Sequence, residues 1–186
     1  MASLVASNRL PEGKSPVLQL QFLQGVVVSC IPWAREMLKS SRAVLDKCVY
    51  TRYLQLCIAS LYTTSAQGRI GAIRDLKLAS TDALLRDGYV MTDSFKTHVT
   101  MGYQAISLSP VSSELVRGYR DFIRPRIPVP STSEFLFVNY GGEYHKDLGR
   151  EITRFFSHCS ATQELHMSST GFRTLVSFAL CVQHFS

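Results

Sequence analysis

Three basic residues have sequence settings that suit the binding of a phosphate group. Arg69 follows a turn-forming stretch, TTSAQG, and Lys96 lies among short segments rich in Val, Ile, Thr, Tyr and Phe. Arg173 lies in an apolar stretch, GFRTLVSFAL. An arginine in so apolar a setting needs a partner or an anion, because burial of an unpaired guanidinium is costly.

Two arginines and a lysine that converge on one point would suit a phosphodiester. Each arginine can donate two parallel hydrogen bonds to the non-bridging oxygens. These bonds would stabilise the additional charge of a pentavalent transition state. A lysine can protonate the leaving 5′ oxygen as a general acid, and a tyrosine would supply the nucleophile.

Each of the three residues also has an ordinary structural explanation. Arg69 could form an ion pair with Asp75 on the same predicted helix. Lys96 could guard the edge of a hairpin against strand pairing, and Arg173 could pair with a buried acid. Taken singly, each residue favours the structural explanation. Their order and context together favour a shared phosphate site.

The elements around Arg69 and Lys96 follow from periodicity and turn residues. A helix over 49–62 would bury a face at helical spacing, made of Tyr50, Leu54, Cys57, Ile58 and Leu61. The TTSAQG stretch ends this helix, and a short helix over 69–76 follows. The segments GYVMTD, FKTHVT and YQAISLS predict a small antiparallel sheet over 88–108.

The helical period returns after this sheet. Val111, Leu115, Tyr119, Phe122 and Ile123 form one predicted stripe, ended by Pro125 and Pro128. The stretch FLFVNYGGEYH reads as a strand or extended segment with a Gly-Gly turn. Further helices are expected over 146–158, burying Leu148, Ile152, Phe155 and Phe156, and over 168–182. The sum is a mostly helical α+β domain with a small antiparallel sheet.

The chain is long enough for one domain with a core and a short segment in front. It has 186 residues, with 46% hydrophobic and 18% charged residues, which is a globular composition. Residues 1–17 are expected to be a flexible lead. Residues 18–47 are expected to be a helical segment, in which 18–31 could be helix or strand and Pro32 opens a helix through 33–45. Residues 48–186 form the main domain.

Charge and cysteine content favour a basic protein of a reducing compartment. The formal net charge is +6 and the isoelectric point is about 9.2, which favours polyanion contacts but is also common in domains that bind no nucleic acid. The five cysteines form no CxxC pair, so free buried thiols are expected, with no metal site and no cofactor. The longest apolar run, 18–33, is too short and polar to span a membrane. The N-terminus does not read as a signal peptide, so the location is nuclear or cytoplasmic.

Four stretches resemble the conserved blocks of tyrosine recombinases, the phage-integrase family. LYTTSAQGRIGAIRDLKLAS resembles the block in which a helix ends in a Thr/Gly turn, an arginine follows and Leu-x-Leu leads into the sheet. FKTHVTMGYQAISLSP resembles the hairpin with the catalytic lysine, and STGFRTLVSFAL resembles the second arginine block. LFVNYGGEYHKDLGREITRFF resembles the segment between them. The likeness covers about 48–180 and is greatest to eukaryotic, transposon-derived (Crypton-like) recombinases.

The resemblance implies a role for each of the three basic residues. Arg69 and Arg173 would be the two phosphate-binding arginines, and Lys96 the general acid in the hairpin. It also implies that 48–186 is an integrase-like catalytic domain of the DNA breaking-rejoining fold, incomplete at its C-terminus. The implied partners are double-stranded DNA and, as a further option, other recombinase-like chains. The implied location is nuclear.

The chain also departs from the family pattern. Ala72 stands where the family usually has an acid, and Thr170 stands in place of the usual histidine. His166 is off register and His184 comes too early for the family's later histidine or tryptophan. No tyrosine follows Arg173, and the tyrosines that precede it in this region lie in the wrong part of the pattern: Tyr103, Tyr140 and Tyr144.

We therefore expect a domain for DNA recombination or integration that binds DNA but cannot cleave it alone; whether it is an enzyme stays open. Binding is expected to be weak, driven by phosphate contacts and steeply salt-dependent. Two alternatives stay open. The chain could be a fragment of an active site-specific recombinase, or a helical protein-interaction module without a DNA role.

Overall fold

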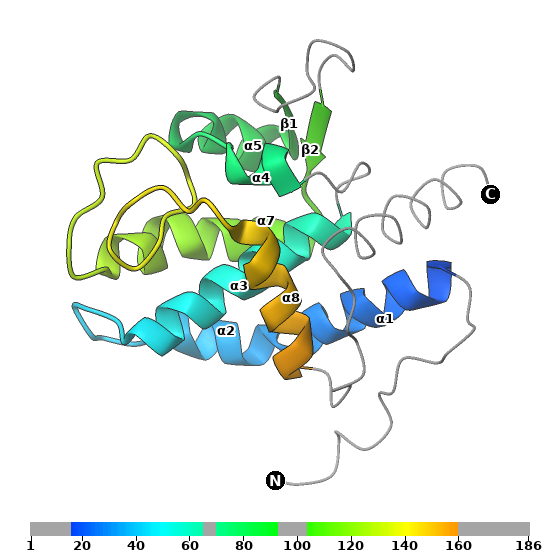
Figure 1. Ribbon diagram of the computed structural model, residues 1–186, viewed down its shortest axis with the longest axis horizontal. Coiled ribbons are helices and arrows are strands. Elements are labelled where there is room, and N and C mark those ends of the chain that lie inside the picture. The colour runs from blue at the N-terminus through cyan, green and yellow to red at the C-terminus, as the bar shows by residue number, and fades with distance from the viewer. Residues whose placement is uncertain (1–15, 65–69, 93–103, 160–186) are drawn as a thin grey trace, which may run out of the picture.

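The computed structural model describes residues 16–64, 70–92 and 104–159 (Figure 1). These residues form a mostly helical α+β structure with one two-stranded antiparallel sheet, in agreement with the predicted class. The helices are α1 (Pro16–Ser29), α2 (Ile31–Leu38), α3 (Lys47–Thr64), α4 (Ile70–Arg74), α5 (Thr81–Asp87), α7 (Pro110–Gly118) and α8 (Leu148–Cys159). The strands are β1 (Tyr89–Thr92) and β2 (Gln104–Ser107); short helical turns are η1 (Leu78–Ser80), η2 (Tyr119–Ile123) and η3 (Arg124–Arg126).

Helix α3 is the centre of the structure. It contacts α1, α7 and α8, and Figure 1 shows these helices arranged around it. The predicted face of α3 is buried, and so are further residues from Tyr53 to Thr63 around the rest of the helix. A helix that is apolar on nearly all sides belongs in an interior, so α3 is the element on which the others pack.

A closed ring of hydrogen bonds joins α3 to two other segments. Tyr50 Oη donates to the Val138 carbonyl oxygen over 2.9 Å and lies 2.8 Å from Tyr119 Oη. Because the Tyr50 proton is used on Val138, the Tyr119 hydroxyl donates to Tyr50 Oη. Tyr119 Oη in turn accepts from the Val138 amide over 3.3 Å. Burial raises the pKa of Tyr50 to about 12 and raises the pKa of Tyr119 well above its usual value. Both hydroxyls therefore stay protonated and keep their donors.

The N-terminal segment forms two helices, although the pattern over 18–31 left helix and strand open. Helix α1 begins at Pro16, and Pro32 lies in the first turn of α2 as expected. The expectation of a helix continuing to Leu45 is wrong, because α2 ends at Leu38. The amides of Lys39 and Ser40 close short turns onto Glu36 and Met37, and Ser-rich sequence favours turns over helix.

The region between α3 and the sheet contains a helix that the sequence analysis did not predict. Helix α4 lies within the predicted range, but α5 was not expected. The local signals for α5 were present, since Asp82 lies in its first turn and Gly88 ends it with φ +78°. A left-handed residue at this position favours glycine. Leu84 anchors α5 in the core.

The sheet lies where it was predicted. Tyr89 pairs with Ser107 and Thr92 pairs with Gln104. Ile106 is buried and Val90 packs against the core, whereas Tyr89 and Met91 are exposed on the other face. The alternation is that of a strand pair with one covered face. The predicted segment FKTHVT lies outside the described residues.

Helix α7 begins with a cap that the sequence carries directly. The Ser109 hydroxyl accepts from the Ser112 amide over 3.1 Å, and Pro110 occupies the first turn. The helical path continues through η2 and η3, where the predicted prolines end it. Phe122 was expected in the buried stripe, but its side chain is 45% exposed. The π-helical turn of η2 changes the phase of the stripe at this point.

The stretch before α8 is extended rather than a regular strand. Leu136, Phe137 and Val138 are buried, and isolated bridges join Phe135 to Lys77 and Val138 to Tyr144. The predicted face of α8 is confirmed, since Leu148, Ile152, Phe155 and Phe156 are all at most 3% exposed. The helix predicted over 168–182 lies outside the described residues, as does most of the expected lead 1–17.

Helices α3 and α7 approach closely where Tyr53 meets Gly118. A Cβ atom on Gly118 would lie 2.2 Å from Tyr53 Oη and 2.9 Å from Leu38 Cδ1. Tyr53 Oη is buried without a hydrogen-bond partner. The absent side chain at position 118 therefore makes room for the tyrosine.

We predict that Gly118→Ala lowers the free energy of unfolding by about 2 kcal/mol, because the added methyl group overpacks the core. Tyr53→Phe removes the unpartnered hydroxyl and should be close to neutral. The double variant should recover part of the loss, since the nearest clashing atom is then absent. Chemical denaturation of the four proteins measures these differences.

Gly25→Ala is the matched control. Gly25 lies in helix α1 with nothing within 4 Å of its Cβ position, so alanine should raise stability slightly there. A Gly118→Ala protein as stable as Gly25→Ala, or unaffected by Tyr53→Phe, would contradict the proposed close packing.

Candidate functional site

The three residues of the predicted phosphate site lie outside the described residues. This holds for Arg69, Lys96 and Arg173, and also for Thr170 and for the neighbouring candidates His166, His184 and Tyr103. The structure describes the segments that flank Arg69 and Lys96 in the sequence. It also describes Asp75, the alternative ion-pair partner of Arg69, and the tyrosines Tyr140 and Tyr144.

The end of α3 at Thr64, five residues before Arg69, is held by β2 and α7. The Ser107 hydroxyl donates to the Thr64 carbonyl oxygen over 3.5 Å, and Thr64 Oγ1 lies 3.2 Å from Ser112 Oγ. Helix α4 begins at Ile70, directly after Arg69, and contacts both α3 and β2. The segments on both sides of Arg69 thus lie against the strand pair.

The same strand pair flanks Lys96. Strand β1 ends at Thr92 and strand β2 begins at Gln104, and these two residues are paired across the sheet. Because the strands are antiparallel, β1 ends and β2 begins at the same end of the strand pair. Helix α4, which follows Arg69, contacts β2, one of the two strands that flank Lys96 in the sequence.

Asp75, the proposed structural partner of Arg69, is bound by two other residues. Arg74 Nε and Nη2 donate to its two carboxylate oxygens over 2.7 and 2.8 Å, and the Tyr144 hydroxyl also donates to it. The hydrogen bond to Asp75 raises the pKa of Arg74. Partial burial and, to a smaller extent, the hydrogen bond to Asp75 raise the pKa of Tyr144 to about 12. The carboxylate thus has partners without Arg69.

Two of the tyrosines that were weighed against the family's nucleophile, Tyr140 and Tyr144, have structural hydrogen bonds. Tyr144 donates to Asp75. Its ring packs against Phe135 with centroids 4.5 Å apart and an interplanar angle of 46°, and Arg74 Cζ lies over the Tyr144 ring, 5.9 Å from its centroid. Tyr140 donates to the Leu45 carbonyl oxygen over 2.7 Å. These contacts hold the segment before α8 against α4 and the start of α3.

Ala72 is fully buried in α4. A carboxylate at this position, where the family usually has one, would need a charged or hydrogen-bonding partner inside the core. The small apolar residue therefore fits its buried surroundings.

A groove between α3 and α8 was not anticipated from the sequence. We name it the α3–α8 groove; it has a volume of about 630 Å³, and its lining includes Lys47, Cys48, Arg52, Gln55, Phe155 and His158. A hollow of about 240 Å³ beside Trp33 and Leu56 shares Arg52 and Phe155 with it. Cys48 is exposed here, whereas Cys57 is buried as expected.

The sequence carries only part of the signal for this groove. Cys48, Arg52 and Leu56 recur at four-residue spacing, which places them on one face of α3. The covering residues, Phe155 and His158, come from a helix about one hundred positions later. Their approach depends on the tertiary structure.

The described ranges offer no candidate for a metal centre or for a membrane-spanning helix. There, no group of three or more His, Cys, Asp or Glu side chains could hold a metal ion. None of the helices in these ranges is long and apolar enough to cross a membrane.

Comparison with known proteins identified no relative. No protein-family model, no curated protein and no solved structure matches the chain.

We predict that Asp75→Asn lowers the free energy of unfolding by about 1–2 kcal/mol, because it turns an acceptor toward Arg74 into a donor and weakens the bond from Tyr144. Thermal and chemical denaturation measure the effect. Asp87→Asn is the matched control, since Arg86 and Asp87 form the same adjacent pair on an exposed surface. An equal effect at both positions would show that Tyr144 and partial burial add nothing to the Asp75 pair.

Proposed function

We propose that the chain binds the phosphate backbone of double-stranded DNA at a site formed by Arg69, Lys96 and Arg173. The observation that carries this proposal is the contact of α4 with β2, which brings together the described segments next to Arg69 and Lys96. The proposal adds that the side chains converge on one phosphate, with Arg173 completing the site.

The order of the described elements supports this proposal. A helix ends at Thr64, α4 and the Leu76–Leu78 stretch follow, and the strand pair leads through Ile106 and Leu108 into a helix. This is the order of the blocks on which the resemblance to tyrosine recombinases depends. The contacts of Asp75 add support, because Arg74 and Tyr144 already bind the acid that was the alternative ion-pair partner of Arg69.

The chemistry of the proposed site is recognition of a phosphate by charge and shape. Two guanidinium groups would bind the non-bridging oxygens and a lysine would approach a bridging oxygen. The net charge of +6 would add attraction at long range. Such contacts carry no base specificity, so affinity would fall steeply with salt. Under this proposal the chain works on DNA in the nucleus.

We predict that Arg69→Ala with Arg173→Ala weakens duplex binding at low salt. Each lost phosphate contact should also reduce the slope of log affinity against log salt by about 1, giving a change of about 2. Fluorescence anisotropy of a labelled duplex over a series of salt concentrations measures both quantities.

Arg42→Ala with Arg117→Ala is the control for the loss of two positive charges. Arg42 follows α2 and Arg117 lies near the end of α7, and both are exposed. Equal weakening in the two double variants would reduce the effect to general charge and overturn the proposed site.

We also predict that a suicide DNA substrate traps no covalent adduct with this chain. The reason is that the 186 residues contain no tyrosine after Arg173 in the position of the family's nucleophile. The measurement is a denaturing gel with labelled DNA. An adduct that is lost on mutation of one tyrosine would instead identify an active recombinase and its nucleophile.

A further inference from the structure

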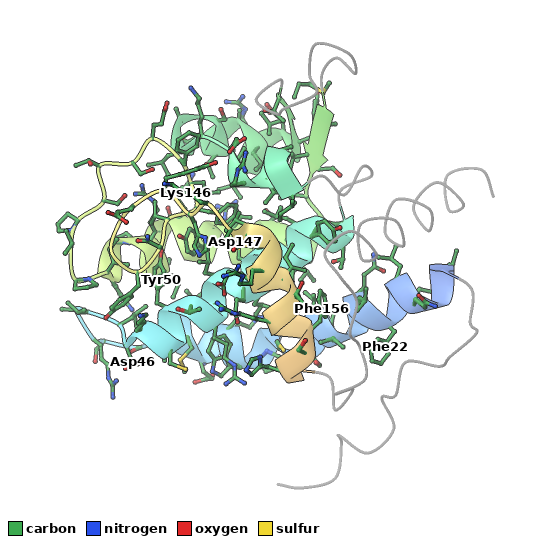
Figure 2. The ribbon with its side chains drawn as sticks, in the orientation of Figure 1. Phe22, Asp46, Tyr50, Lys146, Asp147 and Phe156 are labelled. Atoms are coloured by element: carbon green, nitrogen blue, oxygen red, sulfur yellow. The ribbon has the colours of Figure 1, made fainter. Side chains whose placement is uncertain are left out.

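The α3–α8 groove lies at the opposite end of α3 from the proposed DNA site. Asp46, labelled in Figure 2, lies just before the start of α3, whereas the strand pair lies near its end. Helix α3 has 18 residues, and Gln55, the last α3 residue that lines the groove, lies nine residues before Thr64, which is about 14 Å along the helix. A ligand of the groove would therefore be distinct from DNA bound near Thr64.

The groove has an apolar floor that is already built from the core. Phe155, which is 2% exposed, lies at its base. The fully buried Leu56 and the half-buried Trp33 line the adjoining hollow, which Phe155 also lines. Cys48 to Leu56 spans two helical turns and more, a rise of about 12 Å. An extended peptide covers this length with about four residues.

Two cations and one acid line the groove, namely Lys47, Arg52 and Asp46. The Arg52 guanidinium lies over the Trp33 ring with Cζ 5.6 Å from the centroid, and Lys47 is exposed at the start of α3. No ion pair joins either residue to an acid of the described segments. His158 donates from Nδ1 to the Arg154 carbonyl oxygen over 2.7 Å, which fixes its ring beside the groove.

The acids close to the groove are engaged by local partners. Asp46 Oδ1 accepts from the Cys48 amide over 2.7 Å at the start of α3. Glu151, which is 6% exposed, accepts from Gln55 Nε2 over 2.6 Å and from Arg154 Nη1 over 2.8 Å. The cations of the groove are therefore the groups with capacity left for a ligand.

We propose that the α3–α8 groove binds a short acidic peptide of a partner protein, with one apolar side chain inserted over Phe155 and acidic residues paired with Lys47 and Arg52. Tryptophan, arginine and phenylalanine beside an apolar hollow are the residue types that dominate protein interfaces. The concave apolar floor favours a peptide over duplex DNA, whose backbone would need a longer row of cations.

The experiment uses the full chain and two fluorescein-labelled peptides. In the first, aspartate and glutamate residues surround one phenylalanine and one leucine; in the second, lysine replaces every acid. Fluorescence anisotropy should show binding of the acidic peptide alone. Arg52→Glu should weaken this binding by about tenfold or more, because it places like charges together. Equal binding of the two peptides, or no binding of the acidic one, would overturn the proposal.

Arg117→Glu is the matched control, since it makes the same charge change on exposed α7 and should leave peptide affinity unchanged. Arg52→Gln keeps a long polar side chain over Trp33 and removes only the charge; it carries the test if charge reversal lowers the thermal midpoint. Equal effects of Arg52→Glu and Arg117→Glu would contradict a role for the groove.

Two further measurements test other occupants of the groove. A duplex whose affinity falls more with Arg52→Glu than with Arg117→Glu would identify DNA as the ligand. A dimer in size-exclusion chromatography that Arg52→Glu dissociates would identify a second copy of the chain. Either result would overturn the peptide proposal and leave the predictions for Arg69 and Arg173 intact.

Discussion

The burial of α3 on nearly all sides is the constraint on which the described structure depends. Most polar side chains of a helix inside a core have hydrogen-bond partners, and Tyr50 has them in Tyr119 and the backbone of Val138. These three residues come from three segments that are distant in the sequence. Their ring of hydrogen bonds fixes η2, which follows α7, and the extended stretch before α8 at defined positions on α3. The N-terminal and C-terminal ends of α3 then differ in the segments that surround them.

The two ends of α3 carry the two proposed binding regions. At its C-terminal end, Thr64 contacts β2 and α7, and the short chain to α4 carries Arg69. At its N-terminal end, α8 crosses over the helix and leaves a groove with Arg52 on one side. A rigid central helix can thus present a phosphate site and a peptide site without direct contact between their ligands, and neither proposal depends on the other.

The arginines of this chain show why net charge alone is weak evidence for DNA binding. Arg124 donates to the carbonyl oxygens of Ser133 and Leu136 and so fastens the loop before the extended stretch to η3. Arg74 is engaged by Asp75 and packs near Tyr144. Each is a structural cation, because its donors are used inside the fold. A basic chain can therefore use much of its positive charge for packing, and the proposed DNA contact depends on particular residues.

The sequence by itself determined the elements whose signals are local. Periodicity identified the buried faces of α3 and α8, and the cap at Ser109 and the strand pair follow from neighbouring residues. The convergence of Arg69, Lys96 and Arg173 also came from the sequence and stays a prediction. Only the tertiary structure decided that Phe122 is exposed, that Arg124 fastens a loop and that α8 forms a groove with α3. Periodicity tells which face of a helix is apolar, but the segment that covers this face is selected by packing between residues far apart in the chain.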